Sequence, residues 1–298
     1  MRLGTVRRFI VLAKATTLEI LSEPLSLLLL SAALVLAVIA PALHYHQFGE
    51  VTRMARDSGF SALLIGGFVF AAAGTLRSFR REIEGGTASA ALAHPVSRGT
   101  FFLAKCAGSA LAFALFAATV GSVTLVTVRG AAIGGEIAAK TFDIPKLYGP
   151  CLAVGVAAIV APYPVAAALN RFARCRFALS AFLCSAAIAF AGSFLAFDPD
   201  LWLRLAPGLA LVWFPPLMLI AVAGAASVRL KANAAGAVSA LAVAAFLPFA
   251  GNYCLSEALS RGGSIPLGYV ALAFGSLASA TLAFLLIGIS LFNGKDIS

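Results

Sequence analysis

The sequence predicts an all-α membrane protein: a polytopic helix bundle of about eight transmembrane spans with an amphipathic interfacial helix at the N-terminus. Composition supports this, because 61% of the 298 residues are hydrophobic and only 11% are charged, whereas a soluble domain has about 25% charged residues. The charged residues are also separated by long charge-free stretches. Soluble and disordered chains are thereby excluded, and the five Cys lack the paired spacing of disulfide scaffolds or zinc sites.

Residues 1–23 are expected to form an amphipathic helix that lies in the plane of the membrane. Apolar residues recur every three or four positions, while Arg7, Arg8 and Lys14 lie off that stripe. Such a helix suits an anionic membrane surface. Ser22 and Pro24 predict its end, since proline fits the start of a helix and not its interior. A plain cytoplasmic extension of the first span is the alternative.

Residues 24–298 are expected to form one transmembrane domain. About 20 apolar residues cross about 30 Å of hydrocarbon as a helix, and bare backbone cannot face lipid. The charge-free stretches are Pro24 to Gly49, Ser58 to Leu76, Cys106 to Val128, Leu147 to Asn170, Phe177 to Phe197, Leu205 to Val228, Ala232 to Ser256 and Gly262 to Gly294. A re-entrant pair after Ala232, where Pro248 and Asn252 shorten the apolar core, would leave six spans. Proline pairs are expected to break two spans in mid-membrane, at Pro162 and Pro164 and at Pro215 and Pro216.

The basic residues predict the orientation of the chain. With the N-terminus in the cytoplasm, fifteen of the 22 Lys and Arg fall in cytoplasmic segments and seven in outer segments, in agreement with the positive-inside rule. An even number of spans returns the C-terminus to the cytoplasm. The net charge of +10 is therefore explained by topology, and no nucleic-acid partner is expected.

The cytoplasmic segment 77–105, between the second and third spans, has a recognisable local structure. The second span is expected to continue as a helix until Gly85-Gly86 ends it. Thr87 would cap a short helix that stops before Pro95. Ser97 would cap the helix that enters the membrane next. A short helix between two long ones is suited to press on another protein.

The same segment contains the pattern E-I-E-x-G-T followed by A-L-x-x-P-V-S-R-x-x-F-x-x-x-K. Its residues are Glu82, Ile83, Glu84, Gly86, Thr87, Ala91, Leu92, Pro95, Val96, Ser97, Arg98, Phe101 and Lys105. The pattern resembles the first cytoplasmic loop of type-2 ABC transporter permeases. Further similarity lies at Leu18-Glu19, Glu23-Pro24, Phe48-Gly49-Glu50, Asp57-Ser58-Gly59, Ile265-Pro266, Tyr269-Val270 and Leu291-Phe292. The resemblance covers most of the chain and usually implies six spans.

This resemblance implies a membrane-spanning permease subunit in the bacterial cytoplasmic (inner) membrane. It would couple ATP hydrolysis by a separate ATPase subunit to outward movement of a substrate, as a homodimer or paired with a related permease. The implied ATPase-coupling residues are Glu82, Glu84, Gly85, Gly86, Thr87, Leu92, Pro95, Arg98 and Lys105. Glu82 and Glu84 would contact the ATPase, and Arg98 with Lys105 would anchor the segment at the inner membrane surface.

Catalytic, cofactor and metal sites are not expected in this chain. It has no G-x-x-x-x-G-K-[ST] loop, so ATP and Mg²⁺ would be bound by the partner ATPase. His44 and His46 offer only two ligands to a metal, and Asp198 and Asp200 are typical turn residues. A stand-alone secondary transporter or channel is the alternative function, but it would need ionisable groups inside the spans. A membrane-embedded enzyme would lack a catalytic set.

Overall fold

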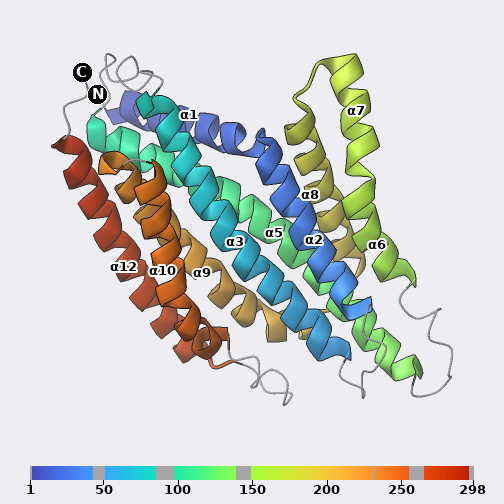
Figure 1. Cartoon of the computed structure of the whole chain (residues 1–298). Coiled ribbons are helices and arrows are strands. Elements are labelled where there is room, and N and C mark those ends of the chain that lie inside the picture. The colour runs from blue at the N-terminus through green and yellow to red at the C-terminus, as the bar shows by residue number, and fades with distance from the viewer. Residues whose placement is uncertain are drawn as a thin grey trace.

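A computed structural model describes residues 2–42, 51–84, 97–138, 149–230, 232–254 and 265–294. These residues form ten helices and no strand. The helices are α1 (Arg2–Leu21), α2 (Pro24–Ala42), α3 (Val51–Glu84), α5 (Arg98–Ala138), α6 (Gly149–Val160), α7 (Pro162–Ala173), α8 (Phe177–Leu195), α9 (Pro199–Arg229), α10 (Ala232–Cys254) and α12 (Leu267–Asn293). The long helices run side by side, and α1 crosses one end of the bundle (Figure 1). The all-α membrane bundle predicted from the sequence is confirmed.

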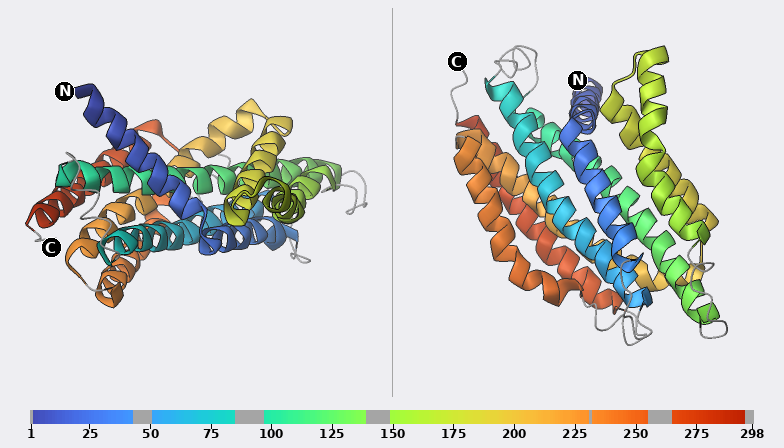
Figure 2. Two further views of the ribbon diagram at one scale, coloured as in Figure 1. Left: turned by 90° about the horizontal axis from the view of Figure 1, so that it is seen from above. Right: turned by 45° about the vertical axis from the view of Figure 1, so that its right-hand side comes forward.

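The first two helices meet in an elbow of 66°. Pro24 is the first residue of α2, and the hydroxyl of Ser26 donates to the carbonyl of Ile20 at 2.6 Å across the break. Proline is tolerated there because the N–H that it lacks would have no helical partner. The helix boundary predicted at Ser22 and Pro24 is therefore confirmed, and Figure 2 shows α1 extending away from α2 over the other helices.

Six helical segments are long and apolar enough to cross a membrane, and the bent α1–α2 pair is a seventh candidate if it counts as one span. The described side chains of α10 give an apolar helix only over Asn233–Ala245, which is shorter than a span. Its ribbon is nevertheless one helix of 23 residues that packs along α9, and it does not form a re-entrant pair. The sequence predicted about eight spans, with six as the alternative, and the described residues provide six or seven candidates.

The two proline pairs have different effects on their helices. Pro162 begins α7 one residue after α6 ends. The predicted break is limited to this local interruption, because Ala161 keeps helical backbone angles (φ −63°, ψ −29°) and Cys151–Ala173 remains one candidate span. The predicted break at Pro215 and Pro216 is wrong, because α9 continues through both as one helix. Both prolines are buried, and a Cβ added to Gly67 of α3 would lie 3.3 Å from Pro216 Cγ. Close packing by neighbouring helices stabilises such a proline-containing helix.

The buried core lies among α2, α3, α5 and α9 and is rich in phenylalanine. Phe70 of α3 stacks on Phe116 of α5 with ring centroids 4.7 Å apart. Phe102 of α5 contacts Phe79 of α3 and Phe292 of α12. Such ring pairs contribute about 0.5–1.5 kcal/mol each beyond the area that they bury. The packing fixes α3 and α5, the two helices that flank segment 85–96.

One end of the bundle, called the basic end below, gathers α1, the ends of α3, α7, α9 and α12 and the starts of α5 and α8 (Figure 1). Arg98 at the start of α5 donates to the carbonyl of Asn293 at 3.2 Å. Arg229 at the end of α9 donates to the carbonyl of Gly294 at 3.1 Å. These bonds satisfy carbonyl groups that a helix C-terminus leaves without intrahelical donors.

At the opposite end, Asp198 closes the turn between α8 and α9. Its Oδ1 accepts from the backbone N–H groups of Asp200 at 3.1 Å and Leu201 at 3.5 Å. Asp198 is thus the N-cap of α9, which confirms the turn role predicted for it. Its Oδ2 pairs with Arg129 of α5, so this carboxylate also ties the turn to a central helix.

Candidate coupling site

The candidate site consists of the end of α3 and the start of α5, the two helix ends that segment 85–96 connects. Helix α3 continues to Glu84, as predicted, and α5 begins at Arg98. The Oγ of Ser97 accepts from the backbone N–H of Thr100 at 3.2 Å, which confirms the predicted N-cap. Five of the predicted coupling residues lie outside the described residues, namely Gly85, Gly86, Thr87, Leu92 and Pro95.

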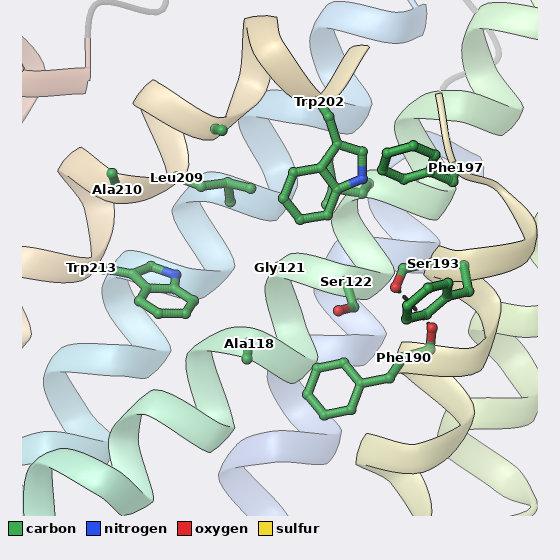
Figure 3. A pocket seen from close by; sticks show the side chains of 13 residues that line it. Ala118, Gly121, Ser122, Phe190, Ser193, Phe197, Trp202, Leu209, Ala210 and Trp213 are labelled. Atoms are coloured by element: carbon green, nitrogen blue, oxygen red, sulfur yellow. Dashed lines mark hydrogen bonds between the residues drawn. The ribbon is translucent and has the colours of Figure 1, made fainter. Parts of the chain in front are cut away.

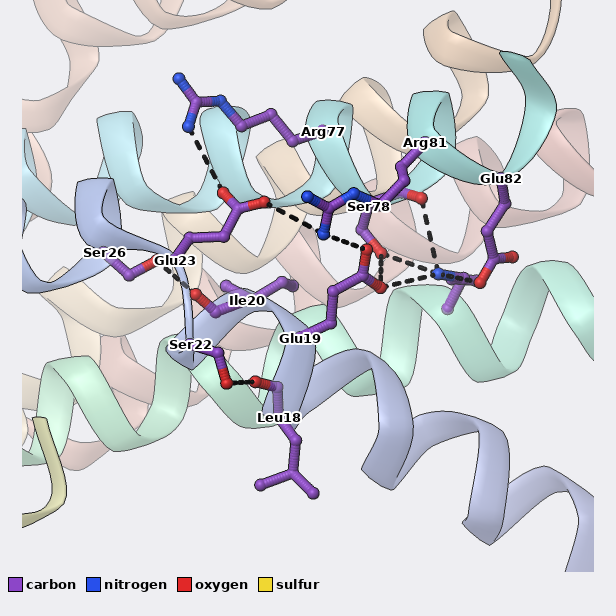
Figure 4. A network of polar contacts seen from close by, with 11 residues as sticks. Leu18, Glu19, Ile20, Ser22, Glu23, Ser26, Arg77, Ser78, Arg81 and Glu82 are labelled. Carbon is purple, nitrogen blue, oxygen red and sulfur yellow. Dashed lines mark hydrogen bonds and ion pairs between the residues drawn. The ribbon is translucent and has the colours of Figure 1, made fainter. Parts of the chain in front are cut away.

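Lys105 of α5 is the central residue of the described part of the site. Its side chain is 2% exposed, and its Nζ lies 2.7 Å from Glu82 Oε1 and 2.8 Å from Ser78 Oγ, both on α3. The Oε2 of Glu19, on α1, lies 3.4 Å from the same nitrogen. Figure 4 shows Glu19, Ser78 and Glu82 converging on this point. One ammonium group therefore joins α1, α3 and α5.

The surface position predicted for Lys105 is wrong. An anchor at the membrane surface would extend its ammonium group toward water and lipid head groups, whereas Lys105 lies between helices. Phe101 and Phe102 precede it in α5 and are both buried. A lysine in such surroundings requires a carboxylate partner, because an unpaired buried charge is strongly destabilising.

Exposed ion pairs extend these contacts from Lys105 to the elbow. Arg81 lies 3.4 Å from Glu19 and 3.9 Å from Glu23, and Arg77 lies 3.4 Å from Glu23. Arg81 is 68% exposed, so each of its pairs contributes only about 0–1 kcal/mol. We call the whole set the elbow network; its members are Glu19, Glu23, Arg77, Ser78, Arg81, Glu82 and Lys105. Its three carboxylates and three cations balance in charge.

Within the elbow network, buried Lys105 contributes more to the free energy of unfolding than the exposed arginines do. Removing one partner of a buried ion pair costs about 3–5 kcal/mol because the other charge stays buried. Glu82 Oε2 is buried and has no hydrogen-bond partner within the described part of the chain. Burying an acceptor without a hydrogen bond costs about 1–3 kcal/mol of folding free energy. The ion pair between Lys105 and the other carboxylate oxygen, Oε1, offsets that cost.

The remaining predicted site residues are placed as follows. Glu82 was expected to contact an ATPase. Its Oε1 instead forms an ion pair with Nζ of Lys105, and its side chain is 24% exposed. Arg98 contacts the end of α12 through the carbonyl of Asn293. Glu84 is the last residue of α3, and its side chain lies outside the described residues. The structure therefore brings Glu82 and Lys105 together, whereas Arg98 contacts the end of α12.

The sequence interpretation missed Glu19, Glu23 and Ser78 as partners of this site. A signal was present, because Ser78 and Glu82 are four residues apart in α3 and residues at that spacing share one helix face. The isolated Lys105 among apolar residues was a second signal. Neither signal indicates which helices meet, because Glu19 and Lys105 are 86 positions apart in the chain.

Metal binding finds no support in the described residues, which hold no group of three or more His, Cys, Asp and Glu side chains placed for an ion. His44 and His46 lie outside those residues. The possible two-ligand site there stays a hypothesis of the sequence alone.

Comparison with known proteins identifies the family. A family model described as "ABC-2 family transporter protein" matches residues 20–195, which is more than half of the chain. No curated protein and no solved structure shows a significant match. The matched region contains helices α2 to α8 and all of segment 77–105. It favours an ABC permease over a stand-alone secondary transporter or channel. Membrane subunits of this family lack ATPase activity and typically bind no cofactor, since a partner handles ATP. The chain therefore belongs to the ABC-2 family and is a multi-pass permease, the membrane subunit of an ABC transporter.

Proposed function

We propose that two copies of this permease form the membrane pathway of an ABC exporter, and that segment 77–105 couples them to two separate ATPase subunits. ATP and Mg²⁺ would be bound by those ATPase subunits. The observation that supports this proposal is the burial of Lys105 where α1, α3 and α5 meet. That point lies directly behind the two helix ends that carry segment 85–96, so a force on the segment reaches it first.

In this mechanism, closure of the ATPase pair presses on the short helix expected at residues 87–93. Helices α3 and α5 then move together, because Lys105 holds Glu82 and Ser78 at 2.7 and 2.8 Å. Glu19 carries the displacement to α1, and the elbow passes it on to α2. A concerted shift of packed helices of this kind switches a transporter between inward-facing and outward-facing states.

We further propose that the basic end faces the cytoplasm of a bacterial cell, with α1 lying at the surface of the inner membrane. Val6 and Ile10 of α1 are each 57% exposed and apolar, whereas Lys14 of the same helix is exposed and basic. A helix at a lipid–water interface needs both kinds of exposed residue. Both chain termini would then lie in the cytoplasm, and the excess of basic residues there follows the positive-inside rule.

Cysteine labelling tests this orientation. Cys175 is exposed in the turn between α7 and α8, at the basic end. In a variant that keeps it as the only cysteine, a membrane-impermeant maleimide should leave intact cells unlabelled and should react after permeabilisation. Asp200→Cys in an otherwise cysteine-free chain is the matched control, because Asp200 is exposed at the opposite end and should react in intact cells. The reverse pattern would invert the topology.

Two variants of segment 77–105, co-expressed with the cognate ATPase, test the coupling role. Glu84→Lys should weaken ATPase binding, since a charged contact across a protein interface contributes about 0.5–3 kcal/mol. Gly85→Ala with Gly86→Ala favours a continuous helix by about 1 kcal/mol per site. That variant should assemble but lose coupling. The measurements are co-purification of the ATPase and permease-stimulated ATP turnover.

The control for the charge reversal is Asp200→Lys, which also replaces an acidic residue by lysine but lies at the opposite end of the bundle. This variant should bind the ATPase and stimulate ATP turnover like the unmodified protein. Glu82→Lys is unsuitable for this test, because it would place a second cation beside Lys105 and disturb the fold. If Glu84→Lys retains full ATPase binding and the glycine variant couples normally, segment 77–105 is only a connector.

A further inference from the structure

A cavity of about 500 Å³ lies between α5, α8 and α9, in the half of the bundle away from the basic end. Much of its wall is aromatic (Figure 3), with Phe190, Phe194, Phe197, Trp202 and Trp213 contributing. None of the 13 residues that line it is charged. Small-molecule sites typically measure about 300–1,000 Å³ and combine apolar walls with a few polar groups. The cavity therefore has the size and lining of such a site.

The rim of this cavity faces the outside of the bundle. Phe194 of α8 is 83% exposed and Trp202 of α9 is 36% exposed, although both line the cavity. In a membrane-spanning bundle, that outer surface is in contact with lipid. A molecule dissolved in the bilayer could thus enter from the side without first crossing into water.

Ser122 of α5 supplies a hydroxyl to the apolar wall. Three threonines of the same helix donate their hydroxyl hydrogens to the backbone carbonyl four residues earlier: Thr119 to Leu115, Thr124 to Val120 and Thr127 to Val123. Ser122 makes no hydrogen bond of this kind within the described residues, and Figure 3 shows its oxygen directed into the space between Trp213 and Phe190. This hydroxyl is available to a ligand.

The indole N–H of Trp213 is a second polar group on the wall. It is buried and has no acceptor among the described residues, whereas buried indole N–H groups usually have one. Rotation of the ring within the cavity wall would present this donor to an acceptor in the cavity. Two hydrogen-bond donors, on α5 and α9, therefore flank a space that is otherwise apolar and aromatic.

We propose that this cavity is a binding site for a neutral, mainly aromatic molecule with one oxygen acceptor, such as a ketone, which enters from the bilayer. Aromatic rings of the ligand would pack against the phenylalanine and tryptophan side chains, and its oxygen would accept from Ser122 and Trp213. Charged molecules are disfavoured, because the wall offers them no opposite charge. The site lies within a single copy of the chain and is separate from the elbow network.

Tryptophan fluorescence gives a direct test, because the chain has only two tryptophans and both line the cavity. The probe is benzophenone, which is neutral, has two phenyl rings and one carbonyl, and quenches tryptophan emission. Added to the full chain in phosphatidylcholine nanodiscs, it should quench saturably. Ser122→Ala should raise the dissociation constant about 2- to 10-fold. Ser193→Ala is the matched control. Ser193 lines the same cavity, but its hydroxyl already donates to the Phe190 carbonyl at 2.9 Å, so this variant should bind benzophenone with an unchanged dissociation constant.

A cavity-filling pair tests the location of the bound probe. Ala118→Phe on α5 should weaken saturable binding at least about tenfold, since Ala118 lines the cavity. Ala114→Phe, one turn earlier on the same helix and similarly half-buried, should have no effect. If Ala118→Phe does not fold, Ala210→Leu on α9 fills the cavity from the other side. Unchanged binding in the filled variant, or quenching that rises linearly without saturation, would overturn the proposal.

A lipid acyl chain is the competing occupant and has its own arm in the experiment. In the Trp202→Phe variant, nanodiscs of phosphatidylcholine brominated on its acyl chains would quench Trp213 strongly if those chains filled the cavity. Benzophenone would then add no saturable component, and the proposal would fail. All of these measurements use the permease without ATPase or nucleotide, so their failure would leave the proposed coupling role unaffected.

Discussion

Lys105→Met is expected to lower the free energy of unfolding by about 3 kcal/mol and to abolish permease-stimulated ATP turnover. The substitution conserves the apolar length of the side chain but removes the charge that joins three helices. It leaves Glu82 and Glu19 without their shared cation in partly buried positions. We expect the lower end of the usual range for buried pairs because these carboxylates keep 24 and 21% exposure.

The midpoint of thermal unfolding in detergent measures the first effect, and turnover with the cognate ATPase measures the second. Arg81→Met is the matched control, since it removes an equal charge from the same network at a side chain that is 68% exposed. That control should cost no more than about 1 kcal/mol for each of the two ion pairs of Arg81, and less than Lys105→Met in total. Adding Glu82→Gln to Lys105→Met should then cost much less than it does alone, as expected for residues in direct contact. Equal losses for the two Met variants would contradict the central role of Lys105.

Gly108→Ala is expected to destabilise the protein by about 1–3 kcal/mol, although alanine normally favours a helix over glycine by about 1 kcal/mol. Gly108 of α5 lies directly against α1. An added Cβ would lie 2.5 Å from the backbone carbonyl oxygen of Ala13 and 2.6 Å from Thr16 Cβ. The hydroxyl of Thr17 donates to the Gly108 carbonyl at 3.0 Å across the same contact. Because backbone atoms cannot move aside as a flexible side chain would, α1 must move away from α5.

Displacing α1 would also carry Glu19 away from Lys105, so coupling to the ATPase should fall together with stability. Gly121→Ala is the matched control on α5. Gly121 is buried in the same helix, but the nearest atom to its added Cβ is Leu209 Cδ2 at 3.7 Å, an ordinary contact. The Gly121→Ala variant should therefore leave the midpoint of thermal unfolding unchanged or raise it slightly. A Gly108 variant as stable as the Gly121 variant would show that α1 does not pack this closely.

Local signals in the sequence were sufficient for the boundaries of several elements. Pro24 begins α2, Ser97 caps α5 and Asp198 caps α9, because each acts on backbone groups within one helical turn of itself. The same locality explains one failure. Pro215 and Pro216 are helix breakers by local rules, yet the buried surroundings of α9 keep them in a continuous helix.

By itself, the sequence determined that the chain is a membrane helix bundle and where several of its helices begin or end. Those properties depend on apolar length, charge position and capping residues, which are all read along the chain. Only the tertiary structure decided that Lys105 is buried against α1 and α3, that Gly108 admits α1, and that both tryptophans line one cavity. The physical reason is that a spanning helix is apolar on every side, so its sequence carries little sign of which face meets protein and which meets lipid. That choice is made by close packing and by a few polar partners far apart in the chain, and it becomes visible only once the helices are assembled.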